Sequence, residues 1–212
     1  MVLTRKVAWD WVAYKALAHA LCLLPLALLV QGVVEDSLGA DPVAAITHST
    51  GDWALRGLLA TLAMTPLRRI TGQSWPLRFR RLLGLYAFFY ASLHLSTYLV
   101  LDLGGYWTQV FEDIVKRPYI TVGFAAWLLL VPLAVTSTRG WMRRLGRRWG
   151  QLHKLVYVVG VLAVLHFVWL VKSDLREPLI YAGILALLLG LRLYWKLAAG
   201  RRQAAQPPMR GA

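Results

Sequence analysis

The sequence has 212 residues, of which 58% are hydrophobic and only 16% are charged, and its mean hydropathy is +0.52. This composition excludes an ordinary soluble domain, whose surface helices need a charged face, and the length fits one compact bundle. The net charge of +14 does not indicate a nucleic-acid partner, because the basic residues fall in short runs between apolar segments.

Six segments reach or approach the roughly 20 mostly apolar residues that a membrane-spanning helix needs. The second is the weakest of them, because His48, Asp52 and Arg56 interrupt its first half. We therefore predict an all-α, polytopic membrane protein with six transmembrane helices. The approximate limits of the predicted spans are 14–34, 44–66, 82–101, 118–137, 151–171 and 178–197.

Lysine and arginine concentrate in alternate connections between these segments. The connections at 68–81 and 139–148 are rich in arginine, whereas those at 35–41, 102–117 and 172–177 hold most of the acidic residues. Connections rich in lysine and arginine remain on the cytoplasmic side of a membrane. The pattern therefore predicts that both termini are cytoplasmic.

The domain organisation follows from the same pattern. Residues 1–200 are predicted to form one transmembrane domain. Residues 201–212 contain two prolines and no apolar run, which is typical of a disordered cytoplasmic tail.

Three histidines, His94, His153 and His166, lie inside or at the edge of apolar stretches. An ionisable ring within the membrane is costly, so it indicates a functional site. His94 lies about 20 Å into the third span and His166 about 22 Å into the fifth, at a rise of 1.5 Å per residue. Both spans enter from the same side, so the two rings reach matching depth. Two neutral imidazoles facing each other across a gap predict a haem with two histidine ligands. The predicted apolar walls are Phe88, Phe89, Leu165 and Phe167.

The alternative for each histidine is a packed, hydrogen-bonded residue without a cofactor. His153 lies about 20 Å below His166, which suits a second haem on the other side of the membrane. That haem would lack an obvious second ligand, and His19 is more readily explained as an ordinary residue. His153 therefore remains open between an iron ligand and an interfacial residue bonded to a neighbour or to water. His48 is predicted to be a loop or cap residue before the second span.

The cytoplasmic arginines allow two interpretations. Topology alone accounts for most of them. Some could instead bind the phosphate or carboxylate of a flavin or an acidic partner protein, with Arg68 and Arg81 as candidates beside Arg78 and Arg80. The sequence contains no glycine-rich phosphate loop to support this second interpretation.

Four stretches of the sequence carry a resemblance to a known family. They are TLAMTPLR (61–68), RRLLGLYAFFYASLHLSTYLVLD (80–102), KRPYITVGFAAWLLLVPLAVTS (116–137) and WGQLHKLVYVVGVLAVLHFVWLVK (149–172). Over roughly residues 10–200 the chain resembles the MsrQ family. These are haem-binding membrane subunits of the periplasmic methionine-sulfoxide reductase system, within the ferric-reductase-like transmembrane group.

The resemblance implies a membrane electron-transfer subunit rather than a catalytic subunit. His94 and His166 match the family's haem b ligands, His153 matches its third histidine, and flavin mononucleotide (FMN) is associated with the family. Electrons would come from quinone or a cytosolic flavin reductase. They would pass to a periplasmic molybdenum-containing subunit that repairs oxidised methionines in envelope proteins. The expected location is the bacterial inner membrane.

The sequence differs from related oxidases and ferric reductases in two respects. Related oxidases and ferric reductases have two histidines on each of two helices, whereas the third span here offers only His94. The third span therefore supplies a ligand for one haem and not for two. Only residues 201–212 follow the last span, far fewer than a flavin and nicotinamide domain needs, so the donor is expected to be external.

Two alternative functions remain from the sequence. A self-contained transmembrane ferric or quinone reductase would need a substrate site on one face, and the sequence does not indicate one. A non-redox scaffold or transporter should show paired repeats and broken helices near the midplane, and no such symmetry is evident in the sequence.

Overall fold

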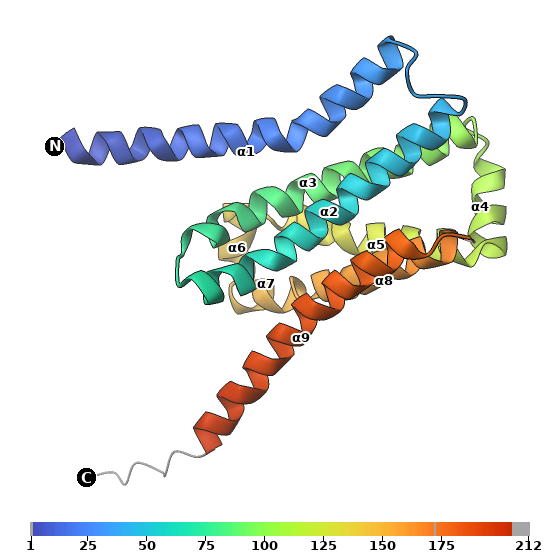
Figure 1. Cartoon of the computed structure of the whole chain (residues 1–212). Coiled ribbons are helices and arrows are strands. Elements are labelled where there is room, and N and C mark those ends of the chain that lie inside the picture. The colour runs from blue at the N-terminus through green and yellow to red at the C-terminus, as the bar shows by residue number, and fades with distance from the viewer. Residues whose placement is uncertain (1, 172, 205–212) are drawn as a thin grey trace, which may run out of the picture.

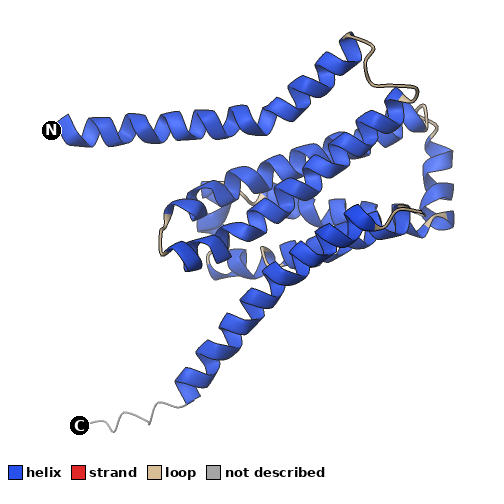
Figure 2. Ribbon diagram, viewed as in Figure 1, coloured by secondary structure: helices blue, strands red, loops and turns tan. Residues whose placement is uncertain are grey.

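The computed structural model describes residues 2–171 and 173–204, and Figure 1 shows their arrangement. Within these ranges every regular element is a helix, as Figure 2 shows, which confirms the predicted all-α class. The helices are α1 (Val2–Val34), α2 (Pro42–Thr71), α3 (Trp75–Thr97), the short π-helix η1 (Tyr98–Asp102), α4 (Trp107–Lys116), α5 (Pro118–Val135), α6 (Arg139–Leu145), α7 (Arg147–Leu152), α8 (Leu155–Leu170) and α9 (Arg176–Ala204).

Local signals explain several helix boundaries. Asp41 caps α2 by accepting a hydrogen bond from the Ala44 backbone N–H, and Pro42 occupies the first turn, where its missing N–H costs nothing. The left-handed Gly72, with a φ of 69°, ends α2. Thr138 caps α6 through the Trp141 N–H. The sequence did not predict the short helices α4 and α6, which lie in connections between the long helices.

Five of the long helical segments are long and apolar enough to cross a membrane, counting η1 with α3 and α7 with α8. Among the described residues, α2 is the long helix that does not qualify, and it corresponds to the weakest predicted span. It runs beside α3 and also packs on α8 and α9 (Figure 1). Of the polar residues that interrupt its sequence, Arg56 is exposed but donates hydrogen bonds to the Asp52 carboxylate and to the Tyr181 hydroxyl of α9, so these groups have partners.

The core consists of two clusters that meet on α2. Leu55, Leu59 and Leu62 of α2 pack with residues of α8 and α9. Leu58, on another face of α2, packs with buried residues of α3, α5 and α8, including the fully buried Val159. Helix α2 therefore organises the bundle, and its partners α3, α5 and α8 hold the candidate site.

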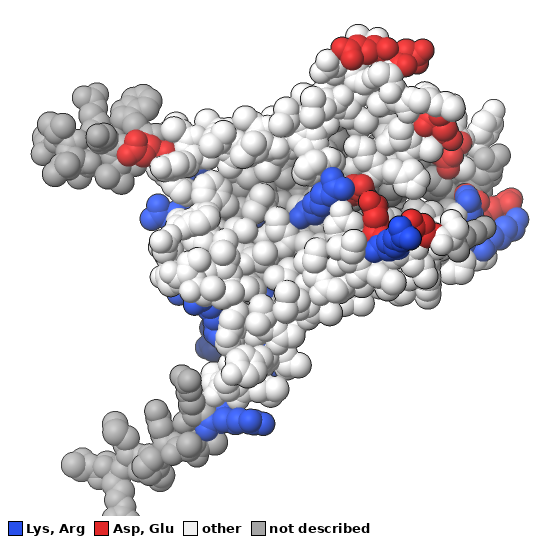
Figure 3. Space-filling view, in the orientation of Figure 1, with Lys and Arg blue, Asp and Glu red and all other residues white. Residues whose placement is uncertain are grey.

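Helix α1 lies at the edge of the bundle, and many of its large apolar side chains are exposed. It contacts α3 through two hydrogen bonds: His19 Nδ1 lies 2.8 Å from the Tyr86 hydroxyl, and Tyr90 donates to the Cys22 carbonyl. In Figure 3 a broad middle zone of the molecule carries few charged side chains. An exposed apolar belt of this kind is what a lipid-facing surface requires.

Two predicted boundaries differ from the structure. The predicted span 151–171 is interrupted, because α7 ends at Leu152 and α8 begins at Leu155, so His153 lies at the break rather than inside a continuous helix. Helix α9 continues to Ala204, into the segment predicted as a tail. The rest of that tail, 205–212, lies outside the described residues.

Candidate functional site

His94 of α3 and His166 of α8 face each other across one cavity of about 320 Å³. We call it the paired-histidine cavity. Residues of α2, α3, α5 and α8 line it, and its walls are mainly apolar. The structure thus brings together the two histidines that helix rise predicted to share one depth.

The distance between the two rings matches two ligands on one metal. Their centroids are 6.1 Å apart, and their planes are nearly perpendicular at 79°. A metal–imidazole bond is roughly 2 Å long, and adding roughly 1 Å from nitrogen to centroid on each side gives about 6 Å. The spacing of the pair therefore fits two histidines that would hold one haem iron between them.

A backbone carbonyl fixes the outer nitrogen of each ring. Nδ1 of His94 lies 2.9 Å from the Thr47 carbonyl oxygen, and Nδ1 of His166 lies 2.7 Å from the Tyr119 carbonyl oxygen. A carbonyl can only accept, so Nδ1 must carry the hydrogen, and Nε2 keeps its lone pair. Ligating histidines in metal sites are held in this way.

A glycine lies against each ring, one turn after the residue that supplies the carbonyl. A Cβ at Gly51 would lie 3.1 Å from His94 Nδ1, and a Cβ at Gly123 would lie 2.7 Å from His166 Nδ1. The bare glycine backbone therefore makes the room that each ring occupies. Sequence reasoning missed both glycines.

The two halves of the site repeat the same arrangement. Each histidine lies 47 positions after the residue whose carbonyl it contacts, and each glycine lies four positions after that residue. Helices α2 and α3 form one half, and α5 and α8 form the other. This shared spacing between Thr47–Gly51 and Tyr119–Gly123 was the available sequence signal.

Residues of η1 and α4 also line the paired-histidine cavity. The Tyr98 hydroxyl donates to the Asp113 carboxylate at 2.8 Å, and Arg117 donates to the same oxygen at 3.0 Å. The hydrogen bond from Tyr98 and the charge of Arg117 hold the pKa of Asp113 below its ordinary value. Tyr98 and Arg117 also line the cavity, so this ionic contact holds its wall in place.

We expect acid to weaken this contact. Because the pKa of Asp113 is lower in the folded protein, the contact stabilises the fold above the ordinary pKa of about 4 and is lost as the pH falls below it. Thermal melts in detergent between about pH 6 and pH 3 should therefore show a steeper loss for the wild type than for Asp113→Asn. Glu112→Gln, one position away and exposed, is the control. An equally steep loss in Asp113→Asn would contradict the assignment.

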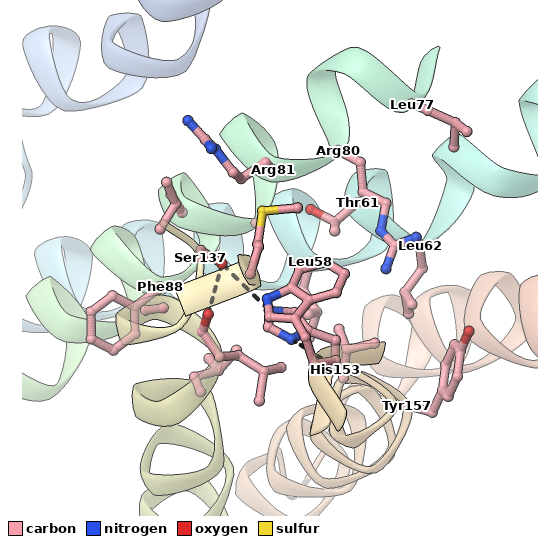
Figure 4. A pocket seen from close by; sticks show the side chains of 18 of the residues that line it. Leu58, Thr61, Leu62, Leu77, Arg80, Arg81, Phe88, Ser137, His153 and Tyr157 are labelled. Carbon is pink, nitrogen blue, oxygen red and sulfur yellow. Dashed lines mark hydrogen bonds between the residues drawn. The ribbon is translucent and has the colours of Figure 1, made fainter. Parts of the chain in front are cut away.

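His153 lies in a second cavity of about 250 Å³, which we call the His153 cavity. Its ring stacks on Trp149, with centroids 3.9 Å apart and planes inclined by 28°. Nδ1 lies 3.1 Å from the Trp149 carbonyl oxygen, and Nε2 lies 3.5 Å from the Ser137 hydroxyl (Figure 4). Nδ1 is thus fixed as in the paired histidines, while the Ser137 contact at Nε2 is long and weak.

The two predicted arginines differ in position. Arg81 lines the His153 cavity but is exposed, and in Figure 4 its side chain points away from His153. Arg68 is exposed at the end of α2 and, among the described residues, lines neither cavity. Arg80 of α3 and Arg192 of α9, both half-buried, also line the His153 cavity. The sequence interpretation did not single out Arg192.

The remaining sequence predictions have mixed outcomes. His19 is bonded to Tyr86 and, within the described ranges, lines neither cavity. His48 lies within α2 and lines the paired-histidine cavity, so its prediction as a loop or cap residue is wrong. Of the four predicted walls only Phe167 lines that cavity, whereas Phe88 lines the His153 cavity. The predicted walls assumed that neighbours in sequence face the same way, which a helix does not allow.

This helical bundle with its paired histidines places the chain in the ferric-reductase-like class of membrane proteins. The family model described as "Ferric reductase like transmembrane component" matches residues 50–164, which contain His94 and His153, and His166 lies two residues beyond the matched range.

Relatives define the family more closely. A protein-methionine-sulfoxide reductase heme-binding subunit MsrQ of Xanthomonas euvesicatoria is 64% identical over 96% of this chain and 97% of that relative. Proteins with the same name are 66% identical in Xanthomonas campestris, over 93% and 94% of the two chains, and 55% identical in Rhodospirillum rubrum, over 88% and 89%. The chain therefore belongs to the MsrQ family. No solved structure matches it at a significant level.

Proposed function

We propose that the chain binds haem b between His94 and His166 and carries electrons across a bacterial inner membrane. The observation that carries this proposal is the 6.1 Å separation of two rings whose Nδ1 atoms are both held by backbone carbonyls. Haem, when bound there, supplies one-electron redox chemistry. With both histidines bound to it, the iron would have no open position, which would favour electron transfer over oxygen chemistry.

The protein contributes orientation and a dry surrounding to this function. The Thr47 and Tyr119 carbonyls set the proton on Nδ1 of each ring and direct Nε2 into the cavity. Leu58, Ala126 and Val159 form the apolar floor of the cavity and exclude water from it. A low dielectric around the iron tunes its reduction potential.

We further propose six membrane spans with both termini cytoplasmic, with α2 as the sixth span. The arginine-rich connections support this orientation through the positive-inside rule. The paired-histidine cavity then lies in the periplasmic half of the membrane, and the His153 cavity lies in the cytoplasmic half. His153 would belong to a second redox-cofactor site on the donor side.

The names of the relatives support the proposed partner. Proteins that share more than half of their residues with this chain are named as subunits of a protein-methionine-sulfoxide reductase. We propose a periplasmic molybdenum-containing reductase subunit as the acceptor and quinone or a cytosolic flavin reductase as the donor. FMN is proposed as a further cofactor, with Arg81 nearer to the His153 cavity than Arg68.

Reconstitution in liposomes tests this function. The protein is reduced from the side of its termini, and reoxidation of its haem is followed after adding the periplasmic subunit with a methionine-sulfoxide peptide. We expect reoxidation that requires both additions and is absent in His94→Ala. Equal reoxidation by ferric chelates or quinone without the partner would instead support a self-contained reductase. A preparation without haem would contradict any redox function.

A further inference from the structure

Arg192 of α9 places a half-buried charged group in the wall of the His153 cavity. It extends from α9 and donates hydrogen bonds to the Tyr157 hydroxyl at 2.9 Å and to the Leu62 carbonyl. Its Nε is buried and, among the described residues, has no hydrogen-bond partner. Both acceptors are neutral, so they satisfy two N–H groups but leave the positive charge uncompensated.

The surroundings of Arg192 add positive charge and no negative charge. Arg80, Arg81 and Arg192 line the His153 cavity, and among its described lining residues there is no aspartate or glutamate. In Figure 4 the Arg80 side chain extends toward Leu62 and Tyr157, the two residues to which Arg192 is bonded. None of the ion pairs in the described residues involves Arg80 or Arg192. Two guanidinium groups in a low dielectric strongly favour an anion between them.

The other walls of the His153 cavity suit a flat apolar ring. Leu58, Phe88, Leu130 and Leu133 line it, and the stacked Trp149 and His153 rings form one side. A molecule that fills this cavity must therefore combine an aromatic ring system with an acidic group.

We propose that Arg192, assisted by Arg80, is an anion-binding residue that holds the carboxylate or phosphate of a ring-bearing cofactor in the His153 cavity. This inference rests on the proposed function, because it takes the bound molecule to be a redox cofactor. It does not require the paired histidines to bind haem. Haem propionate and flavin phosphate share the required chemistry.

Probes with and without the acidic group test this assignment. Haemin is compared with its dimethyl ester, and FMN with riboflavin, on wild type and Arg192→Met. Haemin binding in this cavity is taken as the fraction that His153→Ala removes. We expect Arg192→Met to weaken one charged probe roughly tenfold to hundredfold, the effect of one charge-assisted hydrogen bond, and to leave its uncharged counterpart within about twofold. The probe that is weakened identifies the source of the anion.

Two further variants separate charge from general structure. Arg69 lies near the C-terminal end of α2, over the Trp195 ring, and is not among the described residues that line the His153 cavity. Arg69→Met should therefore leave the binding of both charged probes unchanged. Arg192→Lys retains the charge and should keep most of the preference for the charged probe.

Thermal stability provides a second measurement. The sign of the difference between Arg192→Met and wild type should change when the charged probe is added. Without a probe, Arg192→Met should be as stable as wild type or more stable, because an uncompensated buried charge is removed. With the charged probe bound, it should be less stable than wild type. A purely structural arginine would lower stability equally in both states. Equal loss of charged and uncharged probes, or no loss of either, would overturn the assignment, whereas the haem at His94 and His166 is scored separately by its own spectrum.

Discussion

Replacing either His94 or His166 by alanine is expected to remove the haem between α3 and α8. In the proposed site each ring would supply one of two iron ligands, and the opposite histidine alone would hold the iron weakly. We expect the low-spin b-type spectrum of that haem to disappear, with a loss of at least about tenfold in occupancy, as for the loss of metal ligation in general. Haem-to-protein stoichiometry and reduced-minus-oxidised spectra measure both effects.

His48→Ala is the matched control for this pair. His48 lines the same cavity but is exposed on α2, so its removal should leave the haem in place. Added imidazole should restore a low-spin spectrum to His94→Gly, because the small ligand can occupy the space that the ring leaves. Full haem content in both alanine variants would show that the iron has other ligands.

Gly123→Ala is expected to disrupt the site almost as strongly without touching a ligand. The added Cβ would lie 2.7 Å from His166 Nδ1 and 2.8 Å from Cε1, distances that real Cβ contacts do not reach. The ring must therefore move, and its bond to the Tyr119 carbonyl is lost. We expect roughly tenfold or greater loss of haem, since ligands act only when held within about 0.5 Å of their productive position. Haem stoichiometry and the low-spin spectrum of the purified variant measure this loss.

Substitutions at two other glycines should have smaller effects, because an added Cβ there has more room. Gly51→Ala brings its Cβ to 3.1 Å from the His94 ring, so the ring can yield and the effect should be smaller. Gly183→Ala on α9 has nothing within 4 Å and should keep all its haem while gaining about 1 kcal/mol of helix stability. If Gly123→Ala binds haem as well as Gly183→Ala, the close glycine contact has no role in the site.

The sequence predicted that His94 and His166 reach the same depth, which the structure confirms, but it did not predict the groups that hold the two rings. His94 and His166 were found because helix rise converts position into depth, which needs only local geometry. The carbonyls and glycines that hold them belong to α2 and α5. Which residues of two helices meet depends on rotation and packing, and a single sequence does not specify these.

The differences elsewhere have comparable causes. Hydropathy detected α2 only weakly, because His48, Asp52 and Arg56 lower the hydropathy of its first half. The break at His153 and Lys154 has no proline signal, and the backbone turns there between α7 and α8. Arg192 near the end of the last span looks like an ordinary interfacial arginine in sequence, and only the bonds to Leu62 and Tyr157 reveal it as an inward-facing cation.

Electron paramagnetic resonance of the ferric protein tests most directly whether the two imidazoles share one iron. Two ring planes inclined by 79° predict a strongly anisotropic low-spin signal, which should vanish in both His94→Ala and His166→Ala. A high-spin ferric signal in the wild type, or a low-spin signal that survives in both variants, would contradict coordination of one haem iron by His94 and His166.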